Sequence, residues 1–130
     1  MSREQEARRA VYLRWFEALH ARDLSQLDAL AEEWIADSFI LHDPSFAGLP
    51  PGRVGVKELA GRLVETNSHL AITLDDFFGD GDKTAARFTV QRTNALTGQA
   101  TRFVVLALDD WAGNQLVEEW QLAGPAEELA

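Results

Sequence analysis

One stretch of the sequence says most about the fold: ILHDPSFAGLPPGRVGVK, which runs from Ile40 to Lys57. Its apolar start is typical of a strand, and it runs into His42 and Asp43 before Pro44 ends it. A loop rich in glycine and proline then leads into a helical pattern. A carboxylate at the end of an apolar strand can lie at the mouth of an apolar cavity. Burial there raises its pKa toward the pH at which a general base works.

The residues before this stretch predict two helices and the start of a strand. Residues 3–22 carry one broad apolar stripe at helical spacing. Asp23 can cap a second helix that runs to Trp34, with Gln26 in capping-box spacing. Residues 37–43 then predict a short strand. The stripe of the first helix consists of Val11, Tyr12, Trp15, Phe16 and Leu19.

The residues after it predict a third helix, over 54–66, and then four strands. Glycine-rich turns separate these strands, so their short connections favour mostly antiparallel pairing. Helices at the front and strands at the back indicate an α+β fold, with three N-terminal helices packed on a curved sheet. We expect a single domain over 1–130, with a core over about 12–124 and a frayed tail at 125–130. The strands are expected over 70–78, 83–93, 101–111 and 115–122.

Composition narrows the function classes. The 130 residues are 46% hydrophobic, which is enough for a core, and the net charge is −9. An acidic surface repels phosphate backbones and anionic lipids, so we expect neither a nucleic-acid nor a membrane partner. There is no cysteine, which excludes disulfides and thiolate sites. No apolar run is long enough to span a bilayer, and the polar N-terminus is unlike a signal sequence, so we expect a cytoplasmic protein.

Four motifs in order resemble the NTF2-like superfamily, and within it the SnoaL-like polyketide cyclases. The resemblance covers residues 12–124 and implies a cone, in which a curved antiparallel sheet wraps around a long helix and encloses an apolar pocket. It also implies an apolar small-molecule ligand and a homodimer formed through the outer face of the sheet. The motifs are His42-Asp43-Pro44, the loop 48–57, Gly81-Asp82 with Ala85-Ala86-Arg87, and Val117-Glu118-Glu119-Trp120.

The chain departs from its relatives at reactive positions. The cyclases have an acid/base Asp four residues after the Trp of the last strand, and Gly124 stands there. The related ketosteroid isomerases use a general-base Asp before a Pro, which Asp43 matches. Their tyrosine donor aligns with Trp15, and their second carboxyl falls near Val105 or Leu106. The resemblance therefore implies the fold more strongly than either reaction.

Three residues are the candidates for catalysis: Asp43, His42 and Glu118. Asp43 is either a base at the pocket mouth or a cap for the turn at Pro44. Strand alternation sends His42 and Asp43 to opposite faces, so only one of them can point inward. Glu118 and Arg87 either form a structural ion pair across the sheet or both face the cavity, where a desolvated Glu118 would serve as acid or base.

Several aromatic and polar side chains are the candidates for substrate binding. Most aromatic residues must fill the core, but we expect two or three to line a cavity, with Trp15 and Trp120 foremost. A developing oxyanion would be stabilised by Trp15, Asn94 or Arg87. The full set of predicted binding residues is Tyr12, Trp15, Phe39, Arg87, Asn94, Phe103 and Trp120.

No pattern indicates a cofactor or a metal. The three histidines, His20, His42 and His69, are scattered, and neither a phosphate-binding loop nor a serine-nucleophile motif is present. We therefore expect cofactor-independent acid/base chemistry, an isomerisation or aldol-type cyclisation, on an apolar oxygenated substrate. The alternatives are a domain that binds an apolar ligand without chemistry and an assembly domain with a filled cone. An open pocket and a carboxyl or histidine of perturbed pKa would mark the enzyme.

Overall fold

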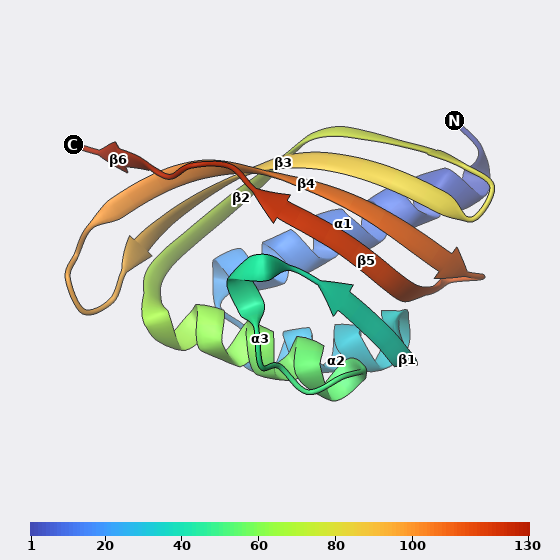
Figure 1. Cartoon of the computed structure of the whole chain (residues 1–130), viewed down its shortest axis with the longest axis horizontal. Helices are drawn as coiled ribbons and strands as arrows, with labels where there is room; N and C mark the ends of the chain where they lie inside the picture. The colour runs from blue at the N-terminus through green and yellow to red at the C-terminus, as the bar shows by residue number, and fades with distance from the viewer.

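The computed structural model describes all residues from 1 to 130. It confirms the α+β class, with three helices followed by most of a six-stranded sheet. Figure 1 shows the helices beneath the sheet, and both ends of the chain at its upper side. The elements are α1 (Arg3–Ala21), α2 (Leu24–Trp34), β1 (Ile35–His42), the 3-10 turn η1 (Pro44–Phe46), α3 (Arg53–Thr66), β2 (Asn67–Asp80), β3 (Lys83–Asn94), β4 (Ala100–Ala112), β5 (Gln115–Ala123) and β6 (Glu127–Leu129).

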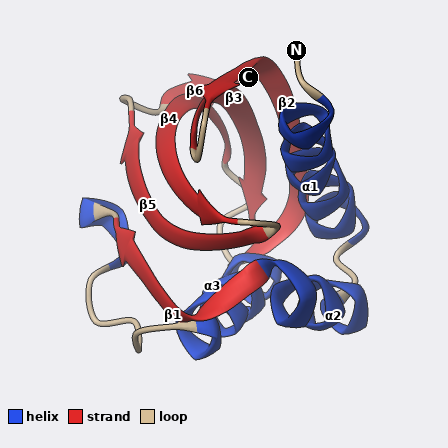
Figure 2. Cartoon of the chain, turned by 90° about the vertical axis from the view of Figure 1, so that its right-hand side faces the viewer, coloured by secondary structure: helices blue, strands red, loops and turns tan.

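The sheet has the strand order β1-β5-β4-β3-β2, and β6 also pairs with β4. From β2 to β5 neighbouring strands are antiparallel, as the short turns predict, whereas β1 runs parallel to β5. In Figure 2 the sheet curls into an unclosed cone, with α1 beside β2 and with α2 and α3 across the lower end. The concave side of the sheet therefore faces the helices.

Local signals fix where the first two helices begin. Ser2 caps α1 by accepting a hydrogen bond from the backbone N–H of Gln5 at 3.1 Å. Asp23 caps α2 as predicted, accepting from the backbone N–H of Gln26 at 3.1 Å. The apolar stripe of α1 packs into the concave side of the sheet, where the ring of Phe16 lies 4.9 Å from that of Phe88.

The loop between β1 and α3 is held against β1 by its glycines. Gly52 has a φ of +82° and donates its backbone N–H to the carbonyl of Phe39 at 2.8 Å. A Cβ at Gly52 would collide with the carbonyl oxygen of Asp37. Glycine alone adopts a positive φ without strain and has no Cβ to collide with Asp37. This explains why Gly52 stands directly before the first residue of α3.

The C-terminal tail differs from the prediction. Residues 125–130 are not frayed throughout, because Glu127–Leu129 pairs with the start of β4 and Arg102 bonds Glu127 at 3.0 Å. The reason is that β5 ends opposite Val105, which leaves the first residues of β4 with an open edge. After the break at residues 124–126 the chain continues in the direction of β5 along that edge.

The outer face of the sheet exposes an apolar patch. Leu106 of β4 lies opposite Leu122 of β5, and Leu108 lies opposite Trp120. These four side chains are between 42% and 63% exposed. None of the three helices combines the length and the apolar character needed to cross a bilayer.

Candidate active site

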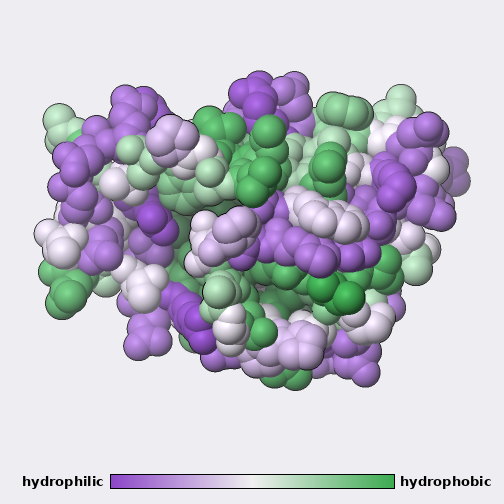
Figure 3. Space-filling model, in the orientation of Figure 1, coloured by the Kyte–Doolittle hydropathy of each residue, from purple (hydrophilic) through white to green (hydrophobic).

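A cavity of about 370 Å³ lies between α1, the concave side of the sheet and the segment from β1 to α3. Most of its lining is apolar, and Figure 3 shows apolar side chains within a hollow whose surroundings are largely hydrophilic. Polar groups are few and lie at particular places: Tyr12, Asp43, Ser45, Arg92, Glu119 and Gln121. A largely apolar cavity with a few polar groups is typical of a small-molecule site.

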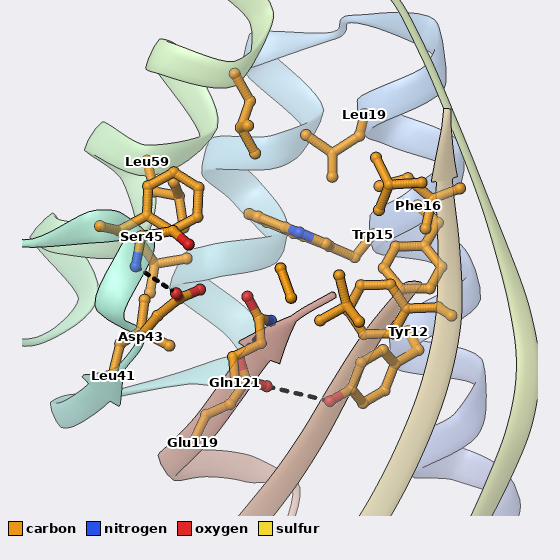
Figure 4. A pocket seen from close by; sticks show the side chains of 18 of the residues that line it. Tyr12, Trp15, Phe16, Leu19, Leu41, Asp43, Ser45, Leu59, Glu119 and Gln121 are labelled. Atoms are coloured by element: carbon orange, nitrogen blue, oxygen red, sulfur yellow. Dashed lines mark hydrogen bonds between the residues drawn. The ribbon is translucent and has the colours of Figure 1, made fainter. Parts of the chain in front are cut away.

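Two carboxyls and a tyrosine meet at the bottom of this cavity. The hydroxyl of Tyr12 on α1 bonds Oδ2 of Asp109 on β4 and lies 3.1 Å from Oε2 of Glu119 on β5. Asp109 and Glu119 are 2% and 8% exposed. Glu119 and Tyr12 reach the cavity, as Figure 4 shows, whereas Asp109 is not among the lining residues.

A β-bulge in β5 brings the two carboxyls together. Trp111 of β4 lies opposite Leu116 and Asp110 lies opposite Glu118, so Val117 is an extra residue without a partner. The bulge shifts the alternation by one, and Glu119 faces inward directly opposite Asp109. Like charges opposite one another on neighbouring strands destabilise a sheet, so this pair must hold at least one proton.

The pKa values of these groups agree with that reading. Burial raises the pKa of the Glu119 carboxyl well above its ordinary range, and the charge of Asp109 raises it further. Burial also raises the pKa of Asp109, although hydrogen bonds from Glu119, Tyr12 and Thr84 oppose the rise. Burial and the two carboxyls raise the pKa of the Tyr12 hydroxyl. Of the two carboxyls, Glu119 therefore has the stronger tendency to keep its proton, because burial and the Asp109 charge both raise its pKa.

A second layer of hydrogen bonds orients the pair. The indole N–H of Trp111 donates to Thr84 Oγ1 at 2.9 Å, and the Thr84 hydroxyl lies 3.5 Å from Asp109 Oδ2. The side-chain amide of Gln121 donates to Glu119 Oε1 at 3.0 Å. Each carboxyl is thus held by neighbours on its own or the adjacent strand, which limits how far it can rotate.

Asp43 follows the end of β1, the strand that pairs with β5, and Leu41, two residues before it, lies opposite Glu119. Oδ1 of Asp43 accepts the backbone N–H of Ser45 at 2.9 Å, so Asp43 does cap the turn at Pro44. Asp43 also lines the cavity, so capping the turn is compatible with a position at the mouth of the pocket. Figure 4 shows it across the cavity from Tyr12, and its charge is a further cause of the raised pKa of Glu119.

The structure brings five of the predicted residues to the cavity. Tyr12 and Trp15 reach it from α1, Phe39 from β1 and Phe103 from β4, together with Asp43. His42 and Asp43 point to opposite faces, as strand alternation requires, and Asp43 is the one that faces inward. The expectation that Trp15 would line the cavity is confirmed.

The other predicted residues lie outside the cavity. His42 bonds Glu118 at 2.7 Å and stacks on Trp120, with 4.8 Å between ring centroids. The placement of Trp120 in the cavity was therefore wrong, because the bulge at Val117 turns it outward together with Glu118.

Arg87 and Asn94 have other partners. Arg87 pairs with Asp76 on β2 at 2.7 Å rather than with Glu118. The side-chain oxygen of Asn94 accepts the backbone N–H groups of Leu96 and Thr97, each at 2.9 Å, and so closes a turn. Neither residue lines the cavity, so their expected contact with an oxyanion there is not supported by the geometry.

Sequence reasoning missed several polar groups of the site. It did not single out Glu119, Gln121 and Arg92, which line the cavity, or Asp109, which bonds Tyr12. Burial of Asp109 had a signal, since it continues the inward alternation of Phe103, Val105 and Ala107 along β4. Gly124, which stands where the cyclases have their acid/base Asp, also lines the cavity. No group of three or more acidic or histidine side chains is placed to hold a metal ion.

Comparison with known proteins decides the family. The model of the SnoaL-like domain matches residues 12–119 of the chain. The chain belongs to the SnoaL-like domain family. The match begins at Tyr12, inside α1, and ends at Glu119 in β5, so it takes in most of the residues that line the cavity. No curated protein matches this SnoaL-like chain.

Solved structures agree on the fold of this SnoaL-like domain. TsrD from Streptomyces laurentii is 17% identical, with a TM-score of 0.77, over 95% of this chain and 90% of that one. A SnoaL-like polyketide cyclase from Agrobacterium tumefaciens is 15% identical, with a TM-score of 0.71, over 90% of this chain and 91% of that one. At these identities the likeness concerns the fold, which is the cone expected from the sequence.

Proposed function

We propose that this SnoaL-like domain is an enzyme that transfers protons, without a cofactor, on an apolar oxygenated small molecule held in the cavity. The reaction would be an isomerisation or an aldol-type cyclisation. One observation carries the proposal: Glu119 is almost completely buried yet lines an open apolar cavity, which Asp43 lines from the neighbouring strand segment. A buried carboxyl is a costly feature that packing alone does not require.

The two carboxyls suit opposite roles. Asp43 would take a proton from a carbon next to a carbonyl group of the substrate. Glu119, which keeps its proton because burial raises its pKa, would give that proton to the carbonyl oxygen as negative charge develops there. The product of this step is an enol. Where a carbon–carbon double bond lies next to that carbon, the enol is conjugated with it; Asp43 then returns its proton to the far end of the double bond while Glu119 takes back the hydroxyl proton, which completes an isomerisation. In a cyclisation, the enol carbon would attack a second carbonyl group instead.

Tyr12 and Asp109 would support the acid rather than touch the substrate's carbon. When Glu119 gives up its proton, the pair would carry an extra negative charge in a buried place. The Tyr12 hydroxyl lies between both carboxyls, and Thr84 and Gln121 supply further hydrogen bonds. These donors reduce the cost of that charge and so bring the acid into a useful pKa range.

The experiment is proton exchange on a ketone whose size suits the cavity. We would incubate 2-tetralone with the protein in D₂O and follow the loss of its α-proton signals by NMR. The wild-type protein should speed the exchange, and Asp43→Asn should lower the rate by about 100-fold or more, because a positioned base contributes about 10²–10⁴-fold. Glu119→Gln should also lower it, while Asp110→Asn, on the outer face beside Lys83, serves as the matched control.

The outcomes separate two assignments of the acid. Loss of exchange in Glu119→Gln, with activity kept in Glu118→Gln, supports Glu119 as the acid. Loss of exchange in Glu118→Gln, with activity kept in Glu119→Gln, supports Glu118, the acid or base expected from the sequence. Exchange that is no faster than in buffer, or that survives Asp43→Asn, contradicts the proposal.

The alternative function is a domain that binds an apolar ligand without chemistry. One observation favours it: Gly124 has no side chain where the cyclases have an acid/base group, and a Cβ there would make only an ordinary contact, at 3.5 Å from Val104 O. Tight binding of 2-tetralone without exchange would support this alternative. The open cavity argues against an assembly domain with a filled cone.

A further inference from the structure

The cavity contains a single cation, and it lies far from the acidic pair. Arg92 is on the inner side of β3, in alternation with the buried Phe88 and Val90, and it lines the cavity. On β4 it lies opposite Thr101, whereas Glu119 lies opposite Asp109. These two β4 positions are eight residues apart (109 − 101), at about 3.3 Å of strand for each residue. Arg92 and Glu119 therefore mark opposite ends of the cavity.

The guanidinium of Arg92 is held in place but has no counter-charge. It stacks over the ring of Phe103 at 5.0 Å, and its Nε–H points to Thr101 Oγ1 at 3.5 Å. None of the chain's ion pairs includes it. Arg3, Arg9, Arg14 and Arg22 also lack an ion pair, but of the five arginines without one Arg92 alone lines the cavity.

We propose that Arg92 binds a carboxylate group of the molecule that enters the cavity, so that the ligand is an apolar carboxylic acid whose opposite end reaches Glu119. The inference deepens the proposed function by naming the class of substrate, and it rests on that function only for the identity of the reacting end. The guanidinium lies over the Phe103 ring and uses only its Nε–H within the chain, so its two terminal nitrogens remain available for a planar carboxylate.

The rest of the cavity suits the same ligand. The wall between Arg92 and Glu119 is largely apolar, so it would accept the hydrocarbon part of the acid. An anion at Arg92 meets little repulsion from the acidic pair, since Arg92 and Glu119 lie opposite β4 positions that are eight residues apart. Its charge would also be partly desolvated, which strengthens its attraction to the guanidinium compared with a pair on the surface.

The test compares an acid with its neutral counterpart of the same shape. Isothermal titration calorimetry at pH 7.5 would measure binding of 4-phenylbutanoate and of 4-phenylbutanamide to the wild-type protein. We expect the acid to bind about tenfold or more tightly, as a charge-assisted hydrogen bond to arginine predicts. Arg92→Gln should bind the two equally. Arg102→Gln should keep the preference, because that arginine pairs with Glu127 and does not line the cavity.

A second measurement needs no substitution. In the wild-type protein, the NMR signal of the Arg92 Nε–Hε group should shift on adding the acid and stay in place on adding the amide. Equal binding of acid and amide by the wild-type protein, no binding of the acid, an unmoved Arg92 signal, or a preference that survives Arg92→Gln would each overturn the inference.

The two proposals can fail separately. A preference for the acid without exchange of 2-tetralone would leave Arg92 as a ligand-binding residue and contradict only the catalytic function. Exchange that depends on Asp43 and Glu119, without a preference for the acid, would contradict only the role of Arg92.

Discussion

Replacing Glu119 by glutamine should make the stability of the folded protein less sensitive to rising pH. Glutamine has the shape of the protonated carboxyl, can accept the hydrogen bond that Gln121 donates to Oε1, and carries no charge. In the wild-type protein, burial raises the pKa of Glu119 in the folded state, with Asp109 as the second cause. The Glu119→Gln variant thus keeps the packing of the protonated side chain but has no proton to release at this position.

The sign of the effect follows from proton binding. At a pH below the ordinary pKa of glutamate, folded and unfolded chains both hold the proton, and the group does not change stability with pH. As the pH rises above that value, the unfolded chain releases its proton first, so the folded state binds more protons. The free energy of unfolding then falls until the pH passes the raised pKa of the folded state.

The magnitude comes from one proton. Each pH unit inside this window should lower the free energy of unfolding of the wild-type protein by up to about 1.4 kcal/mol, relative to Glu119→Gln. Because the Asp109 charge raises the pKa of Glu119, Asp109→Asn should remove part of the same slope.

The assay is urea unfolding, followed by far-ultraviolet circular dichroism at half-unit steps from pH 5 to pH 8. The quantity of interest is the difference between wild type and Glu119→Gln at each pH, because groups common to both proteins cancel. Asp110→Asn is the control, since Asp110 bonds Lys83 on the outer face. A wild-type protein whose stability relative to Glu119→Gln stays constant over this range would refute the reasoning that Glu119 is buried with its proton.

Three further substitutions test other parts of the structure. Tyr12→Phe removes the hydroxyl between the two buried carboxyls and should lower the free energy of unfolding by about 1–3 kcal/mol, measured by urea unfolding; an unchanged value would contradict the network. Gly52→Ala should lower the melting temperature, because the residue has a positive φ and its Cβ would meet the Asp37 carbonyl; a rise would show that the loop adapts. Leu108→Lys, opposite Trp120 in the exposed patch, should shift the homodimer expected from the sequence toward monomer in light scattering; a monomeric wild-type protein would contradict that expectation.

Features that depend on neighbours in the chain could be predicted from the sequence. Helical spacing placed Tyr12 and Trp15 on the inner side of the first helix, and Asp23 caps the second as expected. The order of helices and short turns indicated the α+β class and mostly antiparallel pairing. Alternation at the end of β1 showed that His42 and Asp43 face opposite ways. Each of these needs only the period of a helix or strand and local hydrogen bonding.

The composition of the site depended on register between strands, which the sequence alone could not supply. Alternation counted from Leu116 puts Glu118 and Trp120 inside, but the extra residue at Val117 reverses it and puts Glu119 there instead. Nothing in the local sequence marks that bulge, because it arises from how β5 fits between β1 and β4.

The contact that defines the site is also a tertiary one. Tyr12 meets Asp109 and Glu119 across separations of 97 and 107 residues, when the curved sheet closes over α1. The sequence by itself thus determined the helices, the main strands and their order, because these follow from periodicity and chain connectivity, and the apolar cone followed from the resemblance to the SnoaL-like family. Tertiary structure decided which carboxyls lose contact with water, because burial of a charged group depends on what the rest of the fold places around it.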